Sequence, residues 1–274
     1  MPAWNLTGPM SHPHPPMPIS PETSLVRRLD RDLVLALALL CLWVAVLELF
    51  HAEPGIDLWI QGLFFSHGAC PAGSQAGLVC GSFPLGDIGL LQSLRKILFY
   101  LPFILTAAVV ARLVWALARP GRLAIADLRD TITVLATMAI GPGLIVNGIL
   151  KAYSGRPRPM QTELFGGNMS FMPAGSFGGA CTDNCSFLSG EASGAAWLVC
   201  ALVLLPEPLR RRLTRPVIAI AVLTSGMRVA FGRHFPSDAL LGFLLTLVVF
   251  ALLRLAMRSL PLPAAVHPSP KSHQ

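Results

Sequence analysis

The sequence predicts an all-α fold, a polytopic bundle of six membrane-spanning helices. Of its 274 residues, 53% are hydrophobic and only 13% are charged, roughly half the charged fraction of a soluble domain. Its unbroken apolar stretches are long enough to cross about 30 Å of hydrocarbon. The formal charge of +7 would suit nucleic acid only if the basic residues formed one accessible patch, and they are instead distributed among the loops. We therefore expect membrane lipids as partners and no nucleic acid.

The predicted spans form one membrane domain over residues 31–258. The first span lies too far from Met1 for an ordinary signal peptide and is followed by further spans, so we expect it to be retained. Residues 1–30 and 259–274 are expected to be disordered cytoplasmic segments, because Pro, Ser and His are frequent near both ends of the chain and apolar periodicity is missing there. The six spans cover about 33–50, 98–118, 131–150, 188–205, 216–231 and 239–257.

The distribution of Lys and Arg predicts the orientation, because cytoplasmic loops concentrate positive charge. Six spans place both termini on the same side of the membrane. Fourteen of the 21 basic residues lie in or next to the terminal segments and the loops on that side, so we expect it to be cytoplasmic. Five of the other seven lie inside the motifs described below, where a ligand explains their charge better than topology does. The seven are Arg95, Lys96, Lys151, Arg156, Arg158, Arg228 and Arg233.

Four cysteines lie in the two long loops that this orientation places outside. Cys70 and Cys80 are in the first loop, and Cys181 and Cys185 are in the second. A disulfide within each loop would fit an oxidising outer compartment. Four free thiols, or a zinc site made by all four, are the alternatives.

The first motif follows the third span. It contains Lys151, Arg156 and Arg158, and prolines 157 and 159 flank Arg158. The three basic side chains could anchor the chain at the membrane interface. The two prolines restrict the backbone, however, and favour a positioned arginine whose paired N–H groups match phosphate oxygens.

The second motif opens the fourth span. Ser189 suits the N-cap position of a helix, and Gly190 leaves room for a ligand beside the exposed N–H groups of the first turn. Simple helix capping explains this pair equally well when it is considered alone.

The third motif joins the fifth and sixth spans. Pro236 suits the first turn of a helix, which places His234 and Asp238 four residues apart. We expect the Asp238 carboxylate to accept one imidazole N–H, so that the other ring nitrogen keeps a free lone pair, as a nucleophile requires. A purely structural His–Asp pair is the alternative, but Arg228 nearby adds a cation for a phosphate group.

Together the motifs resemble the type 2 phosphatidic acid phosphatase (PAP2) superfamily, whose pattern is Lys-x6-Arg-Pro, then Pro-Ser-Gly-His, then Ser-Arg-x5-His-x3-Asp. Lys151 and Arg158 match the first part of the pattern, and Arg228, His234 and Asp238 match the third. The resemblance implies a six-helix bundle, attack of His234 on phosphorus, a phosphohistidine intermediate, hydrolysis by water, and neither a metal nor another cofactor. It implies phosphate binding by Lys151, Arg158, Ser189, Gly190 and Arg228.

Three residues depart from the family pattern. Met227 replaces Ser, Leu188 replaces Pro, and Glu191 replaces the His that protonates the leaving alcohol in the family. We expect Glu191 to serve as the general acid, because burial and a bound phosphate dianion would both favour its protonated form. The nearby Lys and Arg side chains oppose that protonation.

Further segments resemble bacterial lipid A 4'-phosphatases, among them 141–148, 165–167, 184–193 and 54–59. The resemblance implies a lipid phosphate substrate, the bacterial inner membrane and an active site on its periplasmic face. Trp59, Phe64 and Phe65 would form an interfacial lid over such a substrate. No obligatory protein partner is expected.

Several rival functions remain at this stage. The substrate could instead be phosphatidylglycerophosphate, phosphatidic acid or undecaprenyl diphosphate. Loss of the family His also leaves room for a non-catalytic, lipid-binding member. A transporter would place ionisable residues near mid-span, whereas the interiors of the last four predicted spans are almost purely apolar.

Overall fold

The computed structural model describes residues 21–73, 77–119 and 125–259, and the predicted tails at 1–20 and 260–274 lie outside this part. The described chain is mainly helical, as predicted. Its α-helices are α1 (Pro21–Ala52), α2 (Gly55–Gly62), α3 (Gly89–Leu117), α4 (Ile125–Met138), α5 (Lys151–Tyr153), α6 (Gly190–Ala201), α7 (Glu207–Ala230) and α8 (Pro236–Ser259). The π-helix η2 (Ala139–Leu150) joins α4 to α5, and short 3-10 helices occur at η1 (Pro84–Asp87), η3 (Pro159–Gln161), η4 (Glu163–Phe165) and η5 (Leu202–Leu204).

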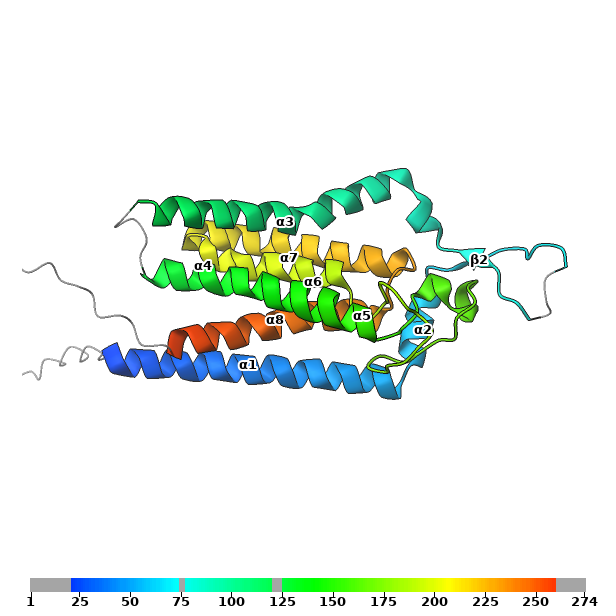
Figure 1. Ribbon diagram of the computed structural model, residues 1–274, viewed down its shortest axis with the longest axis horizontal. Helices are drawn as coiled ribbons and strands as arrows, with labels where there is room; N and C mark the ends of the chain where they lie inside the picture. The colour runs from blue at the N-terminus through cyan, green and yellow to red at the C-terminus, as the bar shows by residue number, and fades with distance from the viewer. Residues whose placement is uncertain (1–20, 74–76, 120–124, 260–274) are drawn as a thin grey trace, which may run out of the picture.

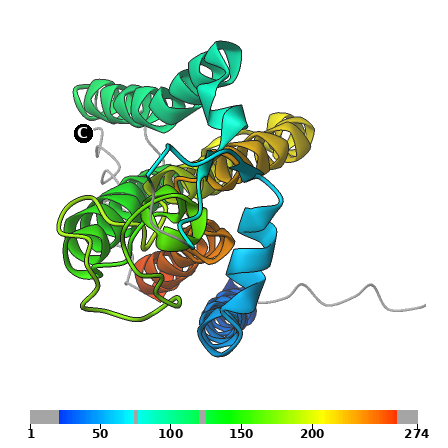
Figure 2. The same ribbon diagram turned by 90° about the vertical axis from the view of Figure 1, so that its right-hand side faces the viewer.

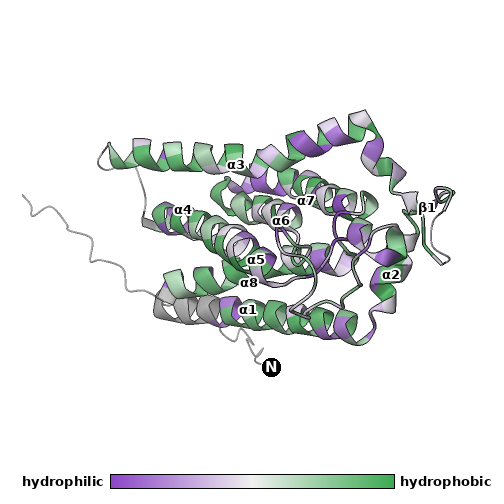
Figure 3. Ribbon diagram, turned by 45° about the vertical axis from the view of Figure 1, so that its right-hand side comes forward, coloured by the Kyte–Doolittle hydropathy of each residue, from purple (hydrophilic) through white to green (hydrophobic). Residues whose placement is uncertain are grey.

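The protein is a multi-pass membrane protein. By length and composition, five helical segments of the described chain could cross a bilayer, and Gly190–Leu204 is a shorter apolar helix. The six predicted spans therefore correspond to five long helices and one shorter one. Figure 1 shows them side by side along the long axis, with the start of α1 and the end of α8 at the same end of the bundle. Figure 3 shows that the helices are mostly hydrophobic along their length.

Five helices begin earlier than the predicted spans, namely α1, α3, α4, α7 and α8. α1 begins at Pro21, inside the stretch 1–30 that was expected to be disordered. α7 begins at Glu207, nine residues before the predicted start at 216, so its arginines belong to a helix rather than to a loop. Glu207 pairs with Arg210 and Arg211 one turn further on, and such pairs stabilise an exposed first helical turn.

The opposite end of the bundle carries α2 and the long loops, which include the two-residue strands β1 (Ser66–His67) and β2 (Gly81–Ser82). The strands pair antiparallel, with Ser66 opposite Ser82. Disulfides close both long loops and join Cys70 to Cys80 and Cys181 to Cys185. Seen from this end, α3 lies at one edge of the bundle and α1 at the other (Figure 2).

The predicted aromatic lid is divided between surface and core. Trp59 on α2 is 68% exposed, as a residue at a membrane interface can be. Phe65, by contrast, packs in a buried cluster with Phe83, Phe165 and Phe235, and Phe64 lies against it. This cluster joins the loops before α3, before α6 and before α8, so Phe65 stabilises the loop end rather than covering it.

The third span widens into the π-helix η2, which contains Pro142. A proline within a helix removes one backbone donor, and segments with π-type hydrogen bonds often occur at functional sites. Here the side-chain amide of Asn147 donates to the Pro142 carbonyl oxygen at 2.6 Å. The last turn of this segment leads directly into Lys151.

A buried ionic network fixes α2 and the first-motif loop to the start of α8. Arg156 is fully buried. Its Nη2 donates to the Asp57 carboxylate at 2.8 Å and its Nη1 to Asp238 at 2.5 Å. Asp57 also accepts the Ser237 backbone N–H at 2.8 Å, and the Arg156 Nε donates to the carbonyl of Met172 at 2.9 Å. Burial raises the pKa of Asp57, and Arg156 and Ser237 oppose that rise by stabilising its charged form.

Replacing Arg156 by Leu should therefore destabilise the loop end strongly. The change leaves two buried carboxylates without their cation, and breaking a buried pair in this way costs about 3–5 kcal/mol. Arg212→Leu is the control, because Arg212 is exposed on α7. Thermal unfolding of detergent-purified protein would show a large loss for Arg156→Leu and little change for the control. Equal transitions for both variants would mean that the network adds no stability.

Candidate functional site

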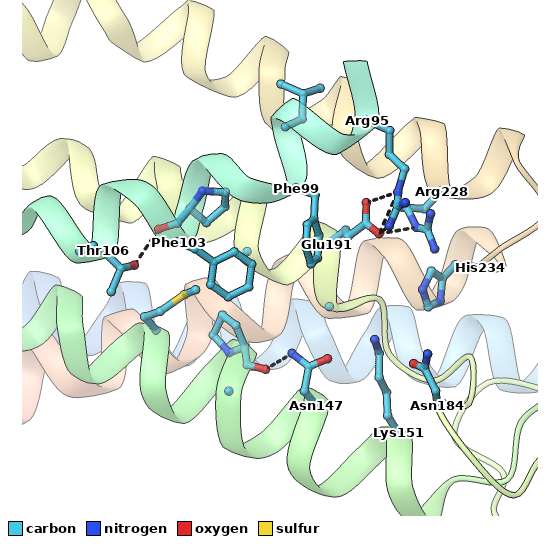
Figure 4. A pocket seen from close by; sticks show the side chains of 18 of the residues that line it. Arg95, Phe99, Phe103, Thr106, Asn147, Lys151, Asn184, Glu191, Arg228 and His234 are labelled. Carbon is cyan, nitrogen blue, oxygen red and sulfur yellow. Dashed lines mark hydrogen bonds and ion pairs between the residues drawn. The ribbon is translucent and has the colours of Figure 1, made fainter. Parts of the chain in front are cut away.

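One cavity of about 780 Å³ joins the three motifs and opens along α3. Its polar end is shown in Figure 4, where side chains from α3, α5, α6 and α7 and from the loop after α7 converge. Its other wall is apolar and extends from Leu98 to Ala107 on α3 and to Met138 on α4. The charged and titratable side chains that line it are Arg95, Lys151, Arg158, Glu191, Arg228 and His234.

His234 is held in one tautomer at the polar end. Its Nδ1 lies 2.8 Å from the carbonyl oxygen of Ser186. Because a carbonyl only accepts hydrogen bonds, Nδ1 carries the hydrogen and Nε2 keeps its lone pair. Within the described part of the chain Nε2 has no hydrogen-bond partner, so it is free to react.

The surroundings of His234 also keep the ring neutral. Burial is the largest cause that lowers its pKa to about 4, and Arg228 and Lys151 add to the effect, whereas Asp238 opposes it. A histidine with such a pKa is uncharged at neutral pH. The neutral ring with a free Nε2 has the properties of a nucleophile.

Asp238 occupies a different place from the one predicted. Its nearest carboxylate oxygen is 3.8 Å from the His234 Nδ1, too far for a hydrogen bond, and the Ser186 carbonyl takes the predicted position. The Asp238 carboxylate instead accepts the Ser186 hydroxyl at 2.5 Å and the Phe235 backbone N–H at 3.0 Å. Asp238 therefore orients the ring through Ser186, and its charge lies close enough to stabilise an imidazolium.

Glu191 lies at the site and pairs with two arginines. Arg95 donates to both of its carboxylate oxygens, with an Nη2 to Oε1 distance of 2.5 Å and an Nε to Oε2 distance of 3.1 Å. The Nε of Arg228 is 3.3 Å from Oε1. The sequence did not predict the contact with Arg95, which lies 96 residues away. The role of general acid at Glu191 stays a prediction.

Gly190 is required by close packing at the start of α6. A Cβ atom built there would lie 2.7 Å from the Asn147 side-chain oxygen and 3.2 Å from the Lys151 Nζ. Any larger residue would displace both side chains. The close approach to Gly190 thus places the Lys151 ammonium beside the first turn of α6, where helix N–H groups favour an anion.

The other two predicted phosphate-binding residues have different positions. Arg158 lines the cavity, and its guanidinium donates to the Asn184 carbonyl at 2.9 Å. Burial is the largest cause that lowers its pKa, and Arg233 nearby is the second. Ser189 is buried as the N-cap of α6, where its hydroxyl accepts the Ala192 N–H at 3.3 Å. It does not line the cavity, so the structure shows it in a capping role.

Sequence reasoning assigned no role to Arg95, Asn147 or Ser186. The available signal for Arg95 was its position at the outer end of the second span, where the charge rule for cytoplasmic loops does not explain it. Asn147 and Ser186 lay inside segments that had been noted only for their resemblance to a family branch. Among the described residues, no group of three or more His, Cys, Asp or Glu side chains could hold a metal ion.

Gly190→Ala should displace Lys151 and Asn147 and weaken anion binding about 10-fold, the usual loss when one charge-assisted hydrogen bond is broken. Gly226→Ala is a matched control, because a Cβ atom at Gly226 would meet no atom within 4 Å. Titration of each purified variant with inorganic phosphate by calorimetry measures the effect. An unchanged affinity in Gly190→Ala would show that the packing around Lys151 is not needed for binding.

Comparison with known proteins identifies the family of the chain. Residues 130–260, which include all three motifs, match the PAP2 superfamily. A lipid A 4'-phosphatase of Rhizobium leguminosarum is 45% identical over 77% of this chain and 91% of its own length, and one of Rhizobium etli is 44% identical over 84% and 90%. The crystal structure of a transmembrane PAP2-type phosphatidylglycerolphosphate phosphatase from Bacillus subtilis superposes with a TM-score of 0.49 at 20% identity, over 80% of this chain and 94% of that one. The chain is a member of the PAP2 superfamily.

Proposed function

We propose that the protein is a lipid A 4'-phosphatase, which removes a phosphate monoester from an amphiphilic membrane lipid. The observation that carries the proposal is a cavity with a charged end and an apolar wall. His234, Lys151, Arg158 and Arg228 line its polar end, and apolar residues of α3 and α4 line the rest. The distance along α3 from Arg95 to Ala107 is about 18 Å at the rise of an α-helix. A phosphate at the polar end would therefore leave a lipid chain beside this apolar wall.

The geometry supports nucleophilic catalysis by His234. Its Nε2 forms a bond to phosphorus while the ester bond to the lipid oxygen breaks, and the departing oxygen takes a proton from solvent. Water then cleaves the phosphorus–nitrogen bond, releases inorganic phosphate and restores the neutral ring. Asp238, 3.8 Å from Nδ1, stabilises the positive charge on the ring between the two steps. Lys151, Arg158 and Arg228 stabilise the charge on the transferred group, so we expect no metal requirement.

Phosphate release from a panel of lipid phosphates tests the activity and the choice of substrate. We expect lipid A to be dephosphorylated in the presence of EDTA, in preference to phosphatidic acid, phosphatidylglycerophosphate and undecaprenyl diphosphate. His234→Ala should abolish both turnover and any acid-labile phosphoenzyme, because it removes the nucleophile. Turnover that EDTA stops and one particular metal restores would contradict this mechanism, and full activity of His234→Ala would exclude the proposed nucleophile.

The same proposal places the site on the periplasmic face of the inner membrane and both termini in the cytoplasm. The start of α1 and the end of α8 lie at the end of the bundle away from the site (Figure 1). Both disulfides lie at the site end, between Cys70 and Cys80 and between Cys181 and Cys185, and disulfides persist in an oxidising compartment. The excess of basic residues near the termini supports the same orientation.

Reporter fusions test this orientation. A fusion after Arg212 should behave as cytoplasmic, because Arg212 lies at the start of α7 at the arginine-rich end of the bundle. A fusion near Gly178, in the loop closed by the second disulfide, should behave as periplasmic. The two activities are measured in the same strain with a phosphatase reporter that is active only outside the cytoplasm. The reverse pattern would overturn both the topology and the proposed compartment.

A further inference from the structure

Arg95 reaches the site from α3, the helix at the edge of the bundle (Figure 2). It lies near the start of α3 and is partly buried, with 25% of its side chain exposed. Figure 4 shows its guanidinium meeting Glu191 beside Arg228, across the cavity from Lys151. Its neighbour Lys96 on the same helix is exposed and does not line the cavity. Arg95 is therefore placed differently from an ordinary interfacial cation.

Glu191 joins Arg95 to Arg228. One Glu191 oxygen, Oε1, contacts the Nη2 of Arg95 at 2.5 Å and the Nε of Arg228 at 3.3 Å. The carboxylate is mostly buried, with 8% of its side chain exposed. A carboxylate between two arginines orients both guanidinium groups. Arg95 is oriented by hydrogen bonds to both Glu191 oxygens. The Nε of Arg228 faces Glu191 as an ion pair without a hydrogen bond, so the Nη groups of Arg228 point away from the carboxylate.

The donors that remain available point to an anion. Within the described part of the chain, the Nη1 of Arg95, both Nη atoms of Arg228 and the Nζ of Lys151 have no hydrogen-bond partner, although all three residues line the cavity. Arg156 makes the contrast clear, because Asp57, Asp238, Ser237 and Met172 occupy its donors. Arg228 is buried, and a buried charge is costly unless it is paired. The free donors of the cavity therefore fit an anionic ligand.

The charge of the cavity also fits an anion. Arg95, Lys151, Arg158 and Arg228 line the polar end, and among the described residues Glu191 is the one carboxylate beside them. The polar end therefore has a net positive charge, which suits a phosphate monoester with about two negative charges at neutral pH.

We propose that Arg95 is a further phosphate-binding residue of this site, and that Glu191 is a positioning residue that holds Arg95 and Arg228 toward the phosphate. The proposal rests on the proposed phosphatase function and extends it. It gives α3, a helix outside the three motifs, a direct part in substrate binding. It also gives Glu191 a role that its ion pairs support, in place of proton transfer.

Binding of inorganic phosphate, measured by calorimetry on the detergent-purified protein, tests the role of Arg95 without turnover. Arg95→Gln should weaken binding about 10- to 100-fold, the usual effect of losing one charged hydrogen-bonding partner. Lys96→Gln should leave binding unchanged. Arg95→Lys should recover only part of the affinity, because an ammonium keeps the charge but not the paired donors that span a carboxylate.

A double-mutant cycle on phosphate release tests the role of Glu191. Glu191→Gln should raise KM and lower kcat in the parent protein, but should change little more in an Arg95→Gln background, because the bridge is already broken. The loss should be equal for lipid phosphate and for p-nitrophenyl phosphate, whose leaving group needs no proton. A general acid would instead show a smaller loss with p-nitrophenyl phosphate and the same loss in both backgrounds.

The two experiments separate the possible failures. Unchanged phosphate affinity in Arg95→Gln, or a parent protein that binds no inorganic phosphate, would overturn the role of Arg95. Independent effects of the two substitutions would overturn the bridge. If the parent protein binds phosphate through Arg95 but releases none from any lipid phosphate, the proposed function fails while the assignment of Arg95 stands.

Discussion

The pairing of fully buried Arg156 with Asp57 and Asp238 is the interaction on which the rest of this end of the molecule depends. A buried ion pair is tolerable only when each member has good partners. Here the guanidinium also donates to Ser237 and Met172, and it lies 4.6 Å from the centre of the Phe235 ring. The network thereby holds α2 and the first-motif loop against α8, and Asp238 in turn holds Ser186, whose carbonyl fixes the tautomer of His234.

The arginines at the loop end of the bundle have two different roles. The partners of their N–H groups show which role each arginine has. Arg156 uses its donors on the protein itself and is structural. Arg228 directs only its Nε toward a protein partner, Glu191, and lines the cavity with the rest of its guanidinium. The first kind of arginine gives rigidity, and the second leaves charge for a ligand. The apolar wall of α3 adjoins these free donors, so the proposed function needs only one cavity for both the phosphate and the lipid that carries it.

The sequence predicted most accurately those features that depend on residues close together along the chain, such as helix caps and helix starts. Ser189 caps α6 and Pro236 opens α8, because capping and proline preferences act over one helical turn. The six apolar stretches appeared as helices for the same kind of reason. The same reasoning was less successful for Asp238, whose spacing from His234 suggested a hydrogen bond at a place where Ser186, 48 residues from His234, provides the acceptor. It also did not predict the contact of Glu191 with Arg95, which lies 96 residues away.

The sequence by itself determined the all-α membrane fold and the three motifs, which supply Lys151, Arg158, Arg228 and His234 to the cavity. Hydrophobic length, residue type and short spacing carry that information. Only the tertiary structure decided that Asp238 acts through Ser186, that Arg156 is structural and that Arg95 belongs to the site. Those outcomes depend on which side chains meet when α2, α3, α6 and α8 pack together, because the guanidinium groups of Arg95 and Arg156 contact carboxylates that lie far away in the sequence.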